Sequence, residues 1–495
     1  MSKPNILYIM SDDHAINSIS CYGSILAEVF KTPNLDRIAE EGCRLNKFIS
    51  TNSLCVPARA SVMTGQYGNI NGVKTLADHW DSTTDVNVAK LIKEQGYQTA
   101  LFGKWHLHDI PRGFDEYKYL GGIKNQQGTY RDPMFFEKGQ EGLVTHKGYV
   151  TDIITDMTLD WLKNREEGKP FFVMCNHKAP HDMWDYPEKF EHIFDGIEIP
   201  EPDSLFEDLS HRSAGSFGYG STVSPKSMIF PKTGKAHSLY KFFMADDYVT
   251  GKLDCDENAS FEEKAHKAYQ KYLKDYLRTV AGIDDSVRQL LEYLEKTGEI
   301  DNTVIIYTSD QGMYLGEHDY CDKRWSYEEG IRTPFLIRYP SEVKAGSVNS
   351  ELVANIDIAP LLLDFAGANV PAAMQGKSFR KVITGEEDGY DAVYFRYWMH
   401  LAHHEIPSHY GIRTQNYKLI YYYGRALGSK GAIDIQTPQA WELYDLKNDP
   451  LELNNIYEKE KNGELVAQLK ARLLELKVQY QDTDDQYPEL LPLVD

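Results

Sequence analysis

Short apolar runs bounded by polar residues recur along the first two thirds of the chain. Clear examples are residues 5–10, 99–102, 171–175 and 303–309. Runs of this length and composition are typical of buried strands. We therefore predict a strand at each of these four positions.

Helical patterns lie between these runs. Residues 33–41 place Leu35 and Ile38 on one face, and Gly42 fits a C-terminal stop. Residues 284–297 repeat apolar side chains at helical spacing. Alternating helices and apolar strands predict an α/β fold, in which a mainly parallel sheet is flanked by helices on both faces.

The character of the chain changes twice after the first strands. Residues from about 185 to 270 are polar, aromatic and poorly periodic, which indicates an insertion that shapes a substrate pocket. From about residue 390 the pattern is that of a smaller antiparallel sheet closed by a helix. The expected strands and helix are residues 393–397, 417–422, 441–445 and 463–480.

These patterns suggest two units. We expect residues 1–385 to form a catalytic domain that contains the insertion. We expect residues 386–495 to form a C-terminal α+β subdomain built on the antiparallel sheet.

Composition narrows the possible partners. The chain of 495 residues has a formal net charge of -21, and 42% of its residues are hydrophobic. Such an acidic chain does not suit nucleic acid as the main partner, because phosphate binding needs dense lysine and arginine. A local group of cations can still bind a small anion, so the overall charge leaves anionic substrates open.

The sequence contains few features that indicate a cellular compartment or a role for its cysteines. No apolar run reaches membrane-spanning length, so we expect no membrane partner. No secretory signal is visible, and we expect a cytoplasmic protein, or a periplasmic one if a signal was trimmed. The six cysteines include no C-x-x-C pair, which argues against a zinc ribbon or a thioredoxin motif.

Acidic side chains follow two of the predicted strands. Asp12 and Asp13 come after the first, and Asp310 with Gln311 after the strand at 303–309. In parallel sheets the carboxyl ends of the strands bind ligands. Oxygen ligands favour a hard cation such as calcium or magnesium. The alternative is that the Asp12 and Asp13 side chains only cap a helix or a turn.

Cys55 is a candidate nucleophile. If a helix begins near Pro57, Arg59 lies on the same face as Cys55 and the cysteine lies at the helix N-terminus. The helix dipole there favours a developing anion. A lone cysteine is more often a small buried hydrophobic residue, and the residues themselves do not exclude that alternative.

Several blocks together resemble the type I sulfatases, which belong to the alkaline-phosphatase-like superfamily. They include C-V-P-A-R, with T-G soon after, and G-K-W-H-L. They also include K-A-P-H, and T-S-D-Q-G followed by D-K-R, all in the order of the family. The blocks are residues 5–13, 55–65, 103–107, 178–181 and 308–324.

The resemblance implies an enzyme that hydrolyses sulfate esters. A maturation enzyme would oxidise Cys55 to formylglycine, whose hydrate attacks sulfur. The metal, Ca2+ with Mg2+ as the alternative, would be held by the four oxygen-bearing side chains named above together with residue 55. Gln311 stands where many members have Asn or His, and Ala58 where many have Ser.

The same resemblance assigns the other catalytic roles. Arg59 would hold the nucleophile, and Lys104 and Lys323 would offset charge on the sulfate oxygens. His181 is the preferred general acid, with Lys323 as a competitor. His106 is the expected base.

The substrate is suggested by a later block. Residues 409–419, H-Y-G-I-R-T-x-x-Y-K-L, resemble carbohydrate sulfatases of gut and marine bacteria, including those that act on 6-O-sulfated N-acetylglucosamine. The expected partner is thus a sulfated saccharide. Arg413 has an alternative role, which is to brace the C-terminal sheet. The candidate substrate-binding residues are Lys178, His318, His404, His409 and Arg413.

Two other functions remain open at the level of sequence. A phosphonate or phosphate monoester hydrolase of the same superfamily would share the fold. A non-catalytic protein that binds sulfated glycans would keep the pocket but not the reaction. Metal content and relative turnover of sulfate and phosphate esters would identify the first alternative. Mass spectrometry of the Cys55 peptide would identify the second, in which the thiol stays unconverted.

Overall fold

The computed structural model describes residues 3–84, 86–122, 126–226, 233 and 237–490. Its centre is one large sheet. In spatial order its strands are β12 (Ser347–Asn349), β2 (Cys43–Ile49), β11 (Arg332–Arg338), β8 (Thr303–Ser309), β1 (Asn5–Ser11), β7 (Phe171–Asn176), β3 (Gln98–Gly103), β4 (Glu116–Leu120), β5 (Met134–Glu137) and β6 (Leu143–Thr145). A short strand, β13 (Val353–Ala354), also pairs with β2. Five neighbouring strands, from β8 to β4 in this order, run parallel.

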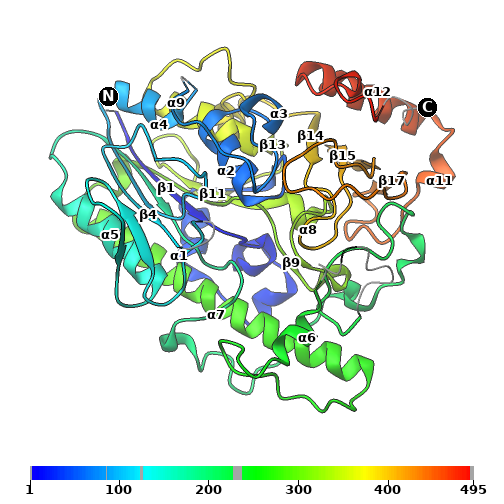
Figure 1. The fold of residues 1–495 in the computed structure, drawn as a ribbon. Coiled ribbons are helices and arrows are strands. Elements are labelled where there is room, and N and C mark those ends of the chain that lie inside the picture. Colours follow the sequence, from blue (N-terminus) through cyan, green and yellow to red (C-terminus); the bar gives the residue numbers. More distant parts are fainter. Residues whose placement is uncertain (1–2, 85, 123–125, 227–232, 234–236, 491–495) are drawn as a thin grey trace.

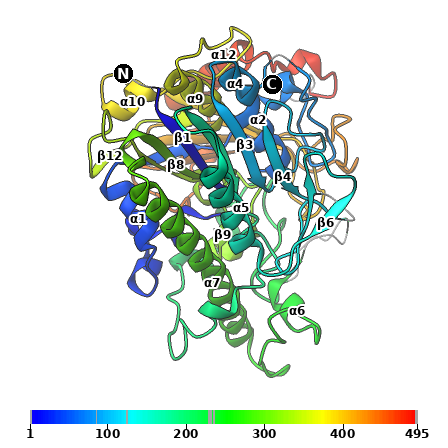
Figure 2. The ribbon, with the colours of Figure 1, turned by 90° about the vertical axis from the view of Figure 1, so that its left-hand side faces the viewer.

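Helices cover both faces of this sheet (Figures 1 and 2). Successive side chains of β1 point to opposite faces, so Ile6 and Tyr8 pack into one core and Leu7 and Ile9 into the other. The first face is covered by α2 (Cys55–Thr64), α4 (Val88–Glu94) and α9 (Ile358–Ala366). The second face is covered by α1 (Pro33–Glu40), α5 (Val150–Asn164) and α7 (Phe261–Lys296).

A second sheet follows in the C-terminal part. Its four antiparallel strands are β14 (Ala392–Tyr397), β15 (His409–Thr414), β16 (Tyr417–Tyr422) and β17 (Ala440–Asp445), and α12 (Glu464–Gln479) packs on them. The core beneath this sheet also contains Ile49, Leu54 and Tyr67 from the first part of the chain. The two parts therefore share hydrophobic residues.

The remaining α-helices and strands of the described residues are short. They are α3 (Gly68–Asn71), α6 (Leu239–Phe243), α8 (Glu328–Ile331), α10 (Arg380–Thr384), α11 (Tyr457–Glu460), β9 (Tyr314–Leu315) and β10 (Cys321–Asp322). Of these, β9 and β10 form a two-stranded antiparallel ribbon.

The predicted α/β fold is confirmed, including the mainly parallel sheet and the separate antiparallel one. Two predictions of elements need correction. The helix expected at 284–297 begins at Phe261, inside the supposed insertion. Strand β15 (His409–Thr414) was not among the strands expected in the C-terminal part.

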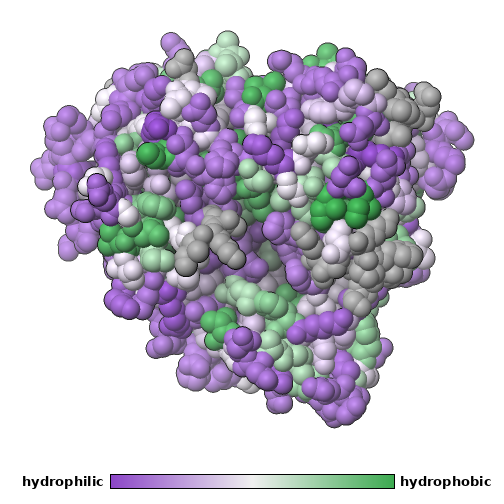
Figure 3. Space-filling view, in the orientation of Figure 1, coloured by the Kyte–Doolittle hydropathy of each residue, from purple (hydrophilic) through white to green (hydrophobic). Residues whose placement is uncertain are grey.

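The surface and the cysteines complete the description. The face in Figure 3 is hollowed near its centre, between α2 and β9 in the orientation of Figure 1, and both hydrophilic and apolar residues border the hollow. All six cysteines are free thiols. Among the described residues, we find no helix both long and apolar enough to span a membrane.

Candidate active site

Three aspartates meet at the carboxyl edge of the central sheet. Asp12 and Asp13 directly follow β1, and Asp310 follows β8, whose last residue Ser309 pairs with Ser11. One ligand oxygen from each aspartate lies within 4.8 Å of the other two, and all three side chains are buried. The parallel register of two adjacent strands thus brings together carboxylates that lie about 300 residues apart in sequence.

The charges of this aspartate cluster are strongly coupled. Burial and the Asp12 carboxylate raise the pKa of Asp310 to about 8, although Arg59 opposes the shift. Burial also acts to raise the pKa of Asp12, but the positive charge of Lys104 holds it well below its usual range. A divalent cation would stabilise the anionic form of all three carboxylates.

The donor set fits a hard cation. Within the described part of the chain, Asp12 Oδ1 and Gln311 Oε1 are buried and accept no hydrogen bond. The Gln311 amide nitrogen donates to Asp13 Oδ1 and lies 3.5 Å from Cys55 Sγ. Carboxylate and amide oxygens are the ligands that calcium and magnesium prefer. The side chains of Asp12, Asp13, Asp310 and Gln311 therefore form a candidate metal site.

Cys55 is the first residue of α2 and is 1% exposed. One ligand atom each from Cys55, Asp12 and His181 lies within 4.8 Å of the other two. Burial raises the pKa of the Cys55 thiol, so an unmodified thiol would stay protonated at neutral pH and be a weak nucleophile.

Arg59 lies one helical turn after Cys55 and is held on two sides. Its Nε and Nη2 atoms are each 2.9 Å from Asp310 Oδ2. Its Nη1 atom donates to the Lys104 carbonyl oxygen at 2.7 Å. The guanidinium therefore ties α2 both to the aspartate cluster and to the segment after β3.

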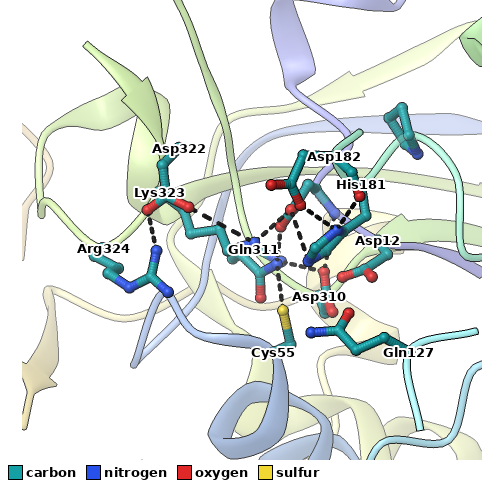
Figure 4. Close-up of polar contacts among 12 residues, drawn as sticks. Asp12, Cys55, Gln127, His181, Asp182, Asp310, Gln311, Asp322, Lys323 and Arg324 are labelled. Carbon is teal, nitrogen blue, oxygen red and sulfur yellow. Dashed lines mark hydrogen bonds and ion pairs between the residues drawn. The ribbon is translucent and has the colours of Figure 1, made fainter. Parts of the chain in front are cut away.

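Two lysines enter the aspartate cluster from different elements (Figure 4 shows Lys323). Lys104 follows β3, is fully buried and forms an ion pair with Asp12. Lys323 follows β10 and forms an ion pair with Asp13. Lys104 also donates to Gln127 Oε1 at 2.7 Å. Both ammonium groups can therefore reach an anion bound beside Cys55.

A third cation, Lys178, lies close by without a carboxylate at hydrogen-bonding distance within the described residues. Its ammonium nitrogen is 4.9 Å from the centroid of the Tyr130 ring. Burial, together with the charge of Lys104, lowers the pKa of Lys178 to about 8. This side chain therefore loses its charge near the upper end of the physiological pH range.

The two histidines predicted to move protons have different surroundings. His106 is buried, its Nδ1 atom has no hydrogen-bond partner among the described residues, and burial lowers its pKa well below the usual value. His181 is partly exposed, and its Nδ1 atom lies 2.5 Å from Asp182 Oδ1. His181 Nε2 is 3.7 Å from Asp13 Oδ2. A neutral imidazole and a carboxylate-paired imidazole thus flank the site.

A polar group on the other side of Lys323 extends the site. Asp322 and Arg324 form a buried ion pair (Figure 4). His404 Nε2 lies 3.2 Å from Asp322 Oδ1, and its Nδ1 atom lies 2.8 Å from Ser221 Oγ. His404, a predicted substrate-binding residue, therefore contacts the Asp322 carboxylate and helps to fix its position. Ser221 comes from the segment that we expected to be an insertion.

Three other predicted substrate residues are bound to partners inside the protein. His318 is buried, with its Nδ1 atom 2.6 Å from Glu207 Oε2. His409 is buried in β15, with Nε2 2.7 Å from Ser326 Oγ. Both side chains therefore have partners inside the protein, and a contact between either of them and substrate stays a prediction.

Arg413 has contacts that fit its alternative role. It is buried in β15, and its Nη2 atom lies 3.1 Å from Glu328 Oε2 on α8. The arginine therefore braces the C-terminal sheet against α8, and a contact with substrate stays a prediction.

The structure adds residues that the sequence interpretation did not single out. These are Gln127, Asp182, Asp322 and Arg324, all of which lie in the site (Figure 4). Three of them directly adjoin predicted residues, because Asp182 follows His181 and the other two flank Lys323. These three could therefore have been proposed from their positions next to predicted site residues. Gln127 is not next to any predicted site residue, so the sequence offered no such reason to propose it.

Comparison with known sequences gives a consistent result. The sequence model of the family described as "Sulfatase" matches residues 4–368, and that described as "N-sulphoglucosamine sulphohydrolase, C-terminal" matches residues 316–479. The chain is 39% identical to an N-acetylglucosamine-6-O-sulfatase of Bacteroides thetaiotaomicron. That alignment covers 97% of this chain and 88% of the relative.

Comparison with solved structures agrees. One protein, solved in complex with its substrate D-glucosamine-2-N,6-O-disulfate, superposes with a TM-score of 0.85 and 37% identity. The match covers 98% of this chain and 99% of that one. A phosphonate monoester hydrolase of Agrobacterium radiobacter superposes with a TM-score of 0.71 at 20% identity, covering 96% of each chain. At that identity the second match shows only a shared fold.

Proposed function

This chain belongs to the sulfatase family of sulfuric ester hydrolases, and we propose that it removes the 6-O-sulfate of N-acetylglucosamine or a closely related glucosamine. The observation that carries the proposal is the convergence of Lys104 and Lys323 on the Cys55 end of α2. The sugar is suggested by the relative that is 39% identical over nearly the whole chain.

Two groups complete the site in this proposal. Calcium, or magnesium in its place, would be held by Asp12, Asp13, Asp310 and Gln311, whose oxygens fit a hard cation. Formylglycine, made from Cys55, would supply the nucleophile for sulfur while the cation polarises the ester. Because Cys55 is buried, we expect the maturation enzyme to act before the chain folds.

The side chains of this protein then position the sulfate. Lys104 follows β3 and pairs with Asp12, whereas Lys323 follows β10 and pairs with Asp13. Because the two ammonium groups come from different elements, they would contact different oxygens of a sulfate bound beside Cys55. Lys178 adds a third positive charge nearby. Cations fixed in a buried site stabilise the charge that develops on these oxygens more than the same groups would in water.

Proton transfer would be divided between the two histidines. His181, held through Nδ1 by Asp182, can donate a proton from Nε2 to the sugar oxygen that leaves. His106 is a neutral imidazole in its buried position and can accept a proton. His181 is favoured over Lys323 as the acid. Burial acts to lower the pKa of Lys323, but the Asp13 carboxylate holds it well above its usual range, so this ammonium is a poor proton donor.

The sugar would be bound on the side of Asp322 and Arg324. The two residues flank Lys323 in the chain and form an ion pair, and the His404 ring contacts the Asp322 carboxylate. A carboxylate and a guanidinium together accept and donate hydrogen bonds, as sugar hydroxyl groups require. The polar pair therefore suits an unsubstituted sugar edge next to the sulfate.

The test is sulfate release from 6-O-sulfo-N-acetylglucosamine, with the 3-O-sulfated isomer as the matched control substrate. The chain is co-produced with a formylglycine-generating enzyme, and Cys55→Ala is the control variant. We expect release from the 6-O isomer at least about 100-fold faster than from the 3-O isomer, and none from Cys55→Ala.

Two outcomes would contradict the proposal in different ways. Equal turnover of both isomers would remove the 6-O assignment and keep the sulfatase reaction. Turnover of a phosphonate ester, with no release from any sulfated sugar, would move the reaction to the alternative that shares this fold.

A further inference from the structure

A tyrosine from α7 reaches the turn that follows β1. Tyr276 lies near the middle of this long helix and is fully buried. Its phenolic oxygen is 2.8 Å from the carbonyl oxygen of Asp13 and 2.8 Å from the amide nitrogen of Ala15. A phenol is both donor and acceptor, so this group donates to the first atom and accepts from the second.

The turn that Tyr276 bridges has an uncommon backbone conformation. Asp13 has φ of 64°, in the left-handed region that a residue with a side chain seldom adopts. The Asp13 carbonyl and the Ala15 amide lie in the interior, where a polar group without a partner is costly. The phenol therefore satisfies both backbone groups in the conformation that the site needs.

Two other contacts hold the backbone of the same turn from the sheet side. The His14 amide donates to Ser309 Oγ at 2.9 Å, and the Asp13 amide lies 3.3 Å from Asp310 Oδ1. Tyr276 supplies the contact from α7, which lies on one face of the central sheet (Figure 2). The turn is thus fixed between the end of β8 and the middle of α7.

We infer that Tyr276 is a positioning residue for the metal site, which acts through the backbone of Asp13 and Ala15 to aim the carboxylates of Asp12 and Asp13. The inference rests on the proposed function, because it assumes that the aspartate cluster binds a cation. Tyr276 itself contacts backbone atoms of the turn and is not one of the candidate metal ligands.

The same helix offers a matched control. Tyr272 lies one turn earlier, is also fully buried, and donates its phenolic hydrogen to the Tyr314 carbonyl oxygen at 2.6 Å. The two rings pack edge to face, with centroids 6.1 Å apart. Removing the Tyr276 hydroxyl therefore costs two buried hydrogen bonds, both to the Asp13 turn, and removing the Tyr272 hydroxyl costs one, which lies outside that turn.

The experiment compares calcium binding by the wild type, Tyr276→Phe and Tyr272→Phe. Each matured enzyme is stripped of metal and titrated with calcium in a calorimeter. We expect the dissociation constant to rise about 10- to 100-fold in Tyr276→Phe, as is usual when a group that orients metal ligands is lost. Tyr272→Phe should bind calcium like the wild type. Saturating calcium should restore most of the turnover of Tyr276→Phe.

Two results would overturn the inference: wild-type calcium affinity in Tyr276→Phe, or an equal loss in Tyr272→Phe, which would show a general packing effect. A wild type that binds no divalent cation would instead count against the metal of the proposed function. If Tyr276→Phe does not fold, hydrogen exchange of the wild type decides. The amides of residues 13–15 should be protected without metal, and rapid exchange there would overturn the inference.

Discussion

At the scale of single residues, the two histidines of the site show that burial and neighbouring charges, and not residue type alone, determine the role of a side chain. His106 is enclosed and its pKa is lowered by burial, whereas His181 is partly exposed and paired with Asp182. The sequence contains both histidines in family blocks but carries no measure of their exposure. Their proposed division into base and acid is therefore supported by burial and by a carboxylate contact.

The contact between Asp182 and His181 leads to a prediction about the leaving group. Asp182→Asn should lower kcat by about 10- to 100-fold for a sugar sulfate, because general acid catalysis contributes that much or more when the leaving alcohol is a poor one. An aryl sulfate, whose phenol leaves readily, should lose much less. The measurement is kcat for both substrates, with His181→Ala as the reference variant. An equal loss on both substrates would contradict the role.

Lys178 gives a prediction about pH. Its pKa is lowered to about 8, mainly by burial, so it is cationic below that pH and neutral above it. An anionic substrate should bind less well as the charge is lost, and we expect KM to rise about tenfold between pH 7 and pH 9.

Two variants check the assignment to Lys178. Lys178→Met should have a high KM at pH 7 and no such rise, whereas Lys178→Arg should keep a low KM above pH 8 because its charge persists. The same alkaline rise in Lys178→Met would assign the pH dependence to another group.

One region contains partners that the sequence interpretation did not identify. His409 and Arg413 were expected to face a sugar because their block resembles carbohydrate sulfatases. Both side chains lie in β15 and are held by Ser326 and Glu328 inside the protein. A sequence does not show that a polar side chain already has an internal partner, so these partners could not be predicted.

At the scale of elements, the strands were predictable because each is a short apolar run with a polar end. The acidic residues after β1 and β8 came together as the parallel arrangement requires. The start of α7 was not predictable in the same way. Its first half buries Tyr269, Tyr272 and Tyr276, whose hydroxyl groups bond to backbone atoms, and apolar periodicity does not register such residues.

The close approach of β3 to β7 at Gly103 leads to a prediction about stability. This residue ends β3 with φ of 103°, and a Cβ atom there would lie 1.9 Å from the Asn176 carbonyl oxygen. Gly103→Ala should therefore lower the free energy of unfolding by about 2–4 kcal/mol, as measured by urea denaturation.

Gly139→Ala is the control for Gly103→Ala. Gly139 also has a positive φ, but a Cβ atom at this position would have no neighbour within 4 Å. The substitution should cost only about 1 kcal/mol for its backbone conformation. Equal losses in the two variants would show that the close approach to β7 is unimportant.

At the scale of the whole molecule, the two expected units are closely joined. The core under the antiparallel sheet includes Leu54 and Tyr67 from the N-terminal part together with Tyr394 and Leu443. We therefore predict that residues 1–385 produced alone will be insoluble or unfolded, because one side of a shared core would be exposed to water.

The measurement for this truncation is soluble yield and circular dichroism. Co-production of residues 386–495 is the control, and it should restore soluble protein. A soluble and active fragment 1–385 would show that the C-terminal part is an independent domain.

The free cysteines have a practical consequence for anyone who prepares this enzyme. Six thiols are present and none is joined to another, so the denatured, unconverted chain should react with six equivalents of a thiol reagent. Conversion of Cys55 removes one of them. The fraction of molecules that carry the aldehyde can thus be read from a reagent titration under denaturing conditions, between six equivalents and five, without a substrate and without knowledge of which sugar the enzyme prefers.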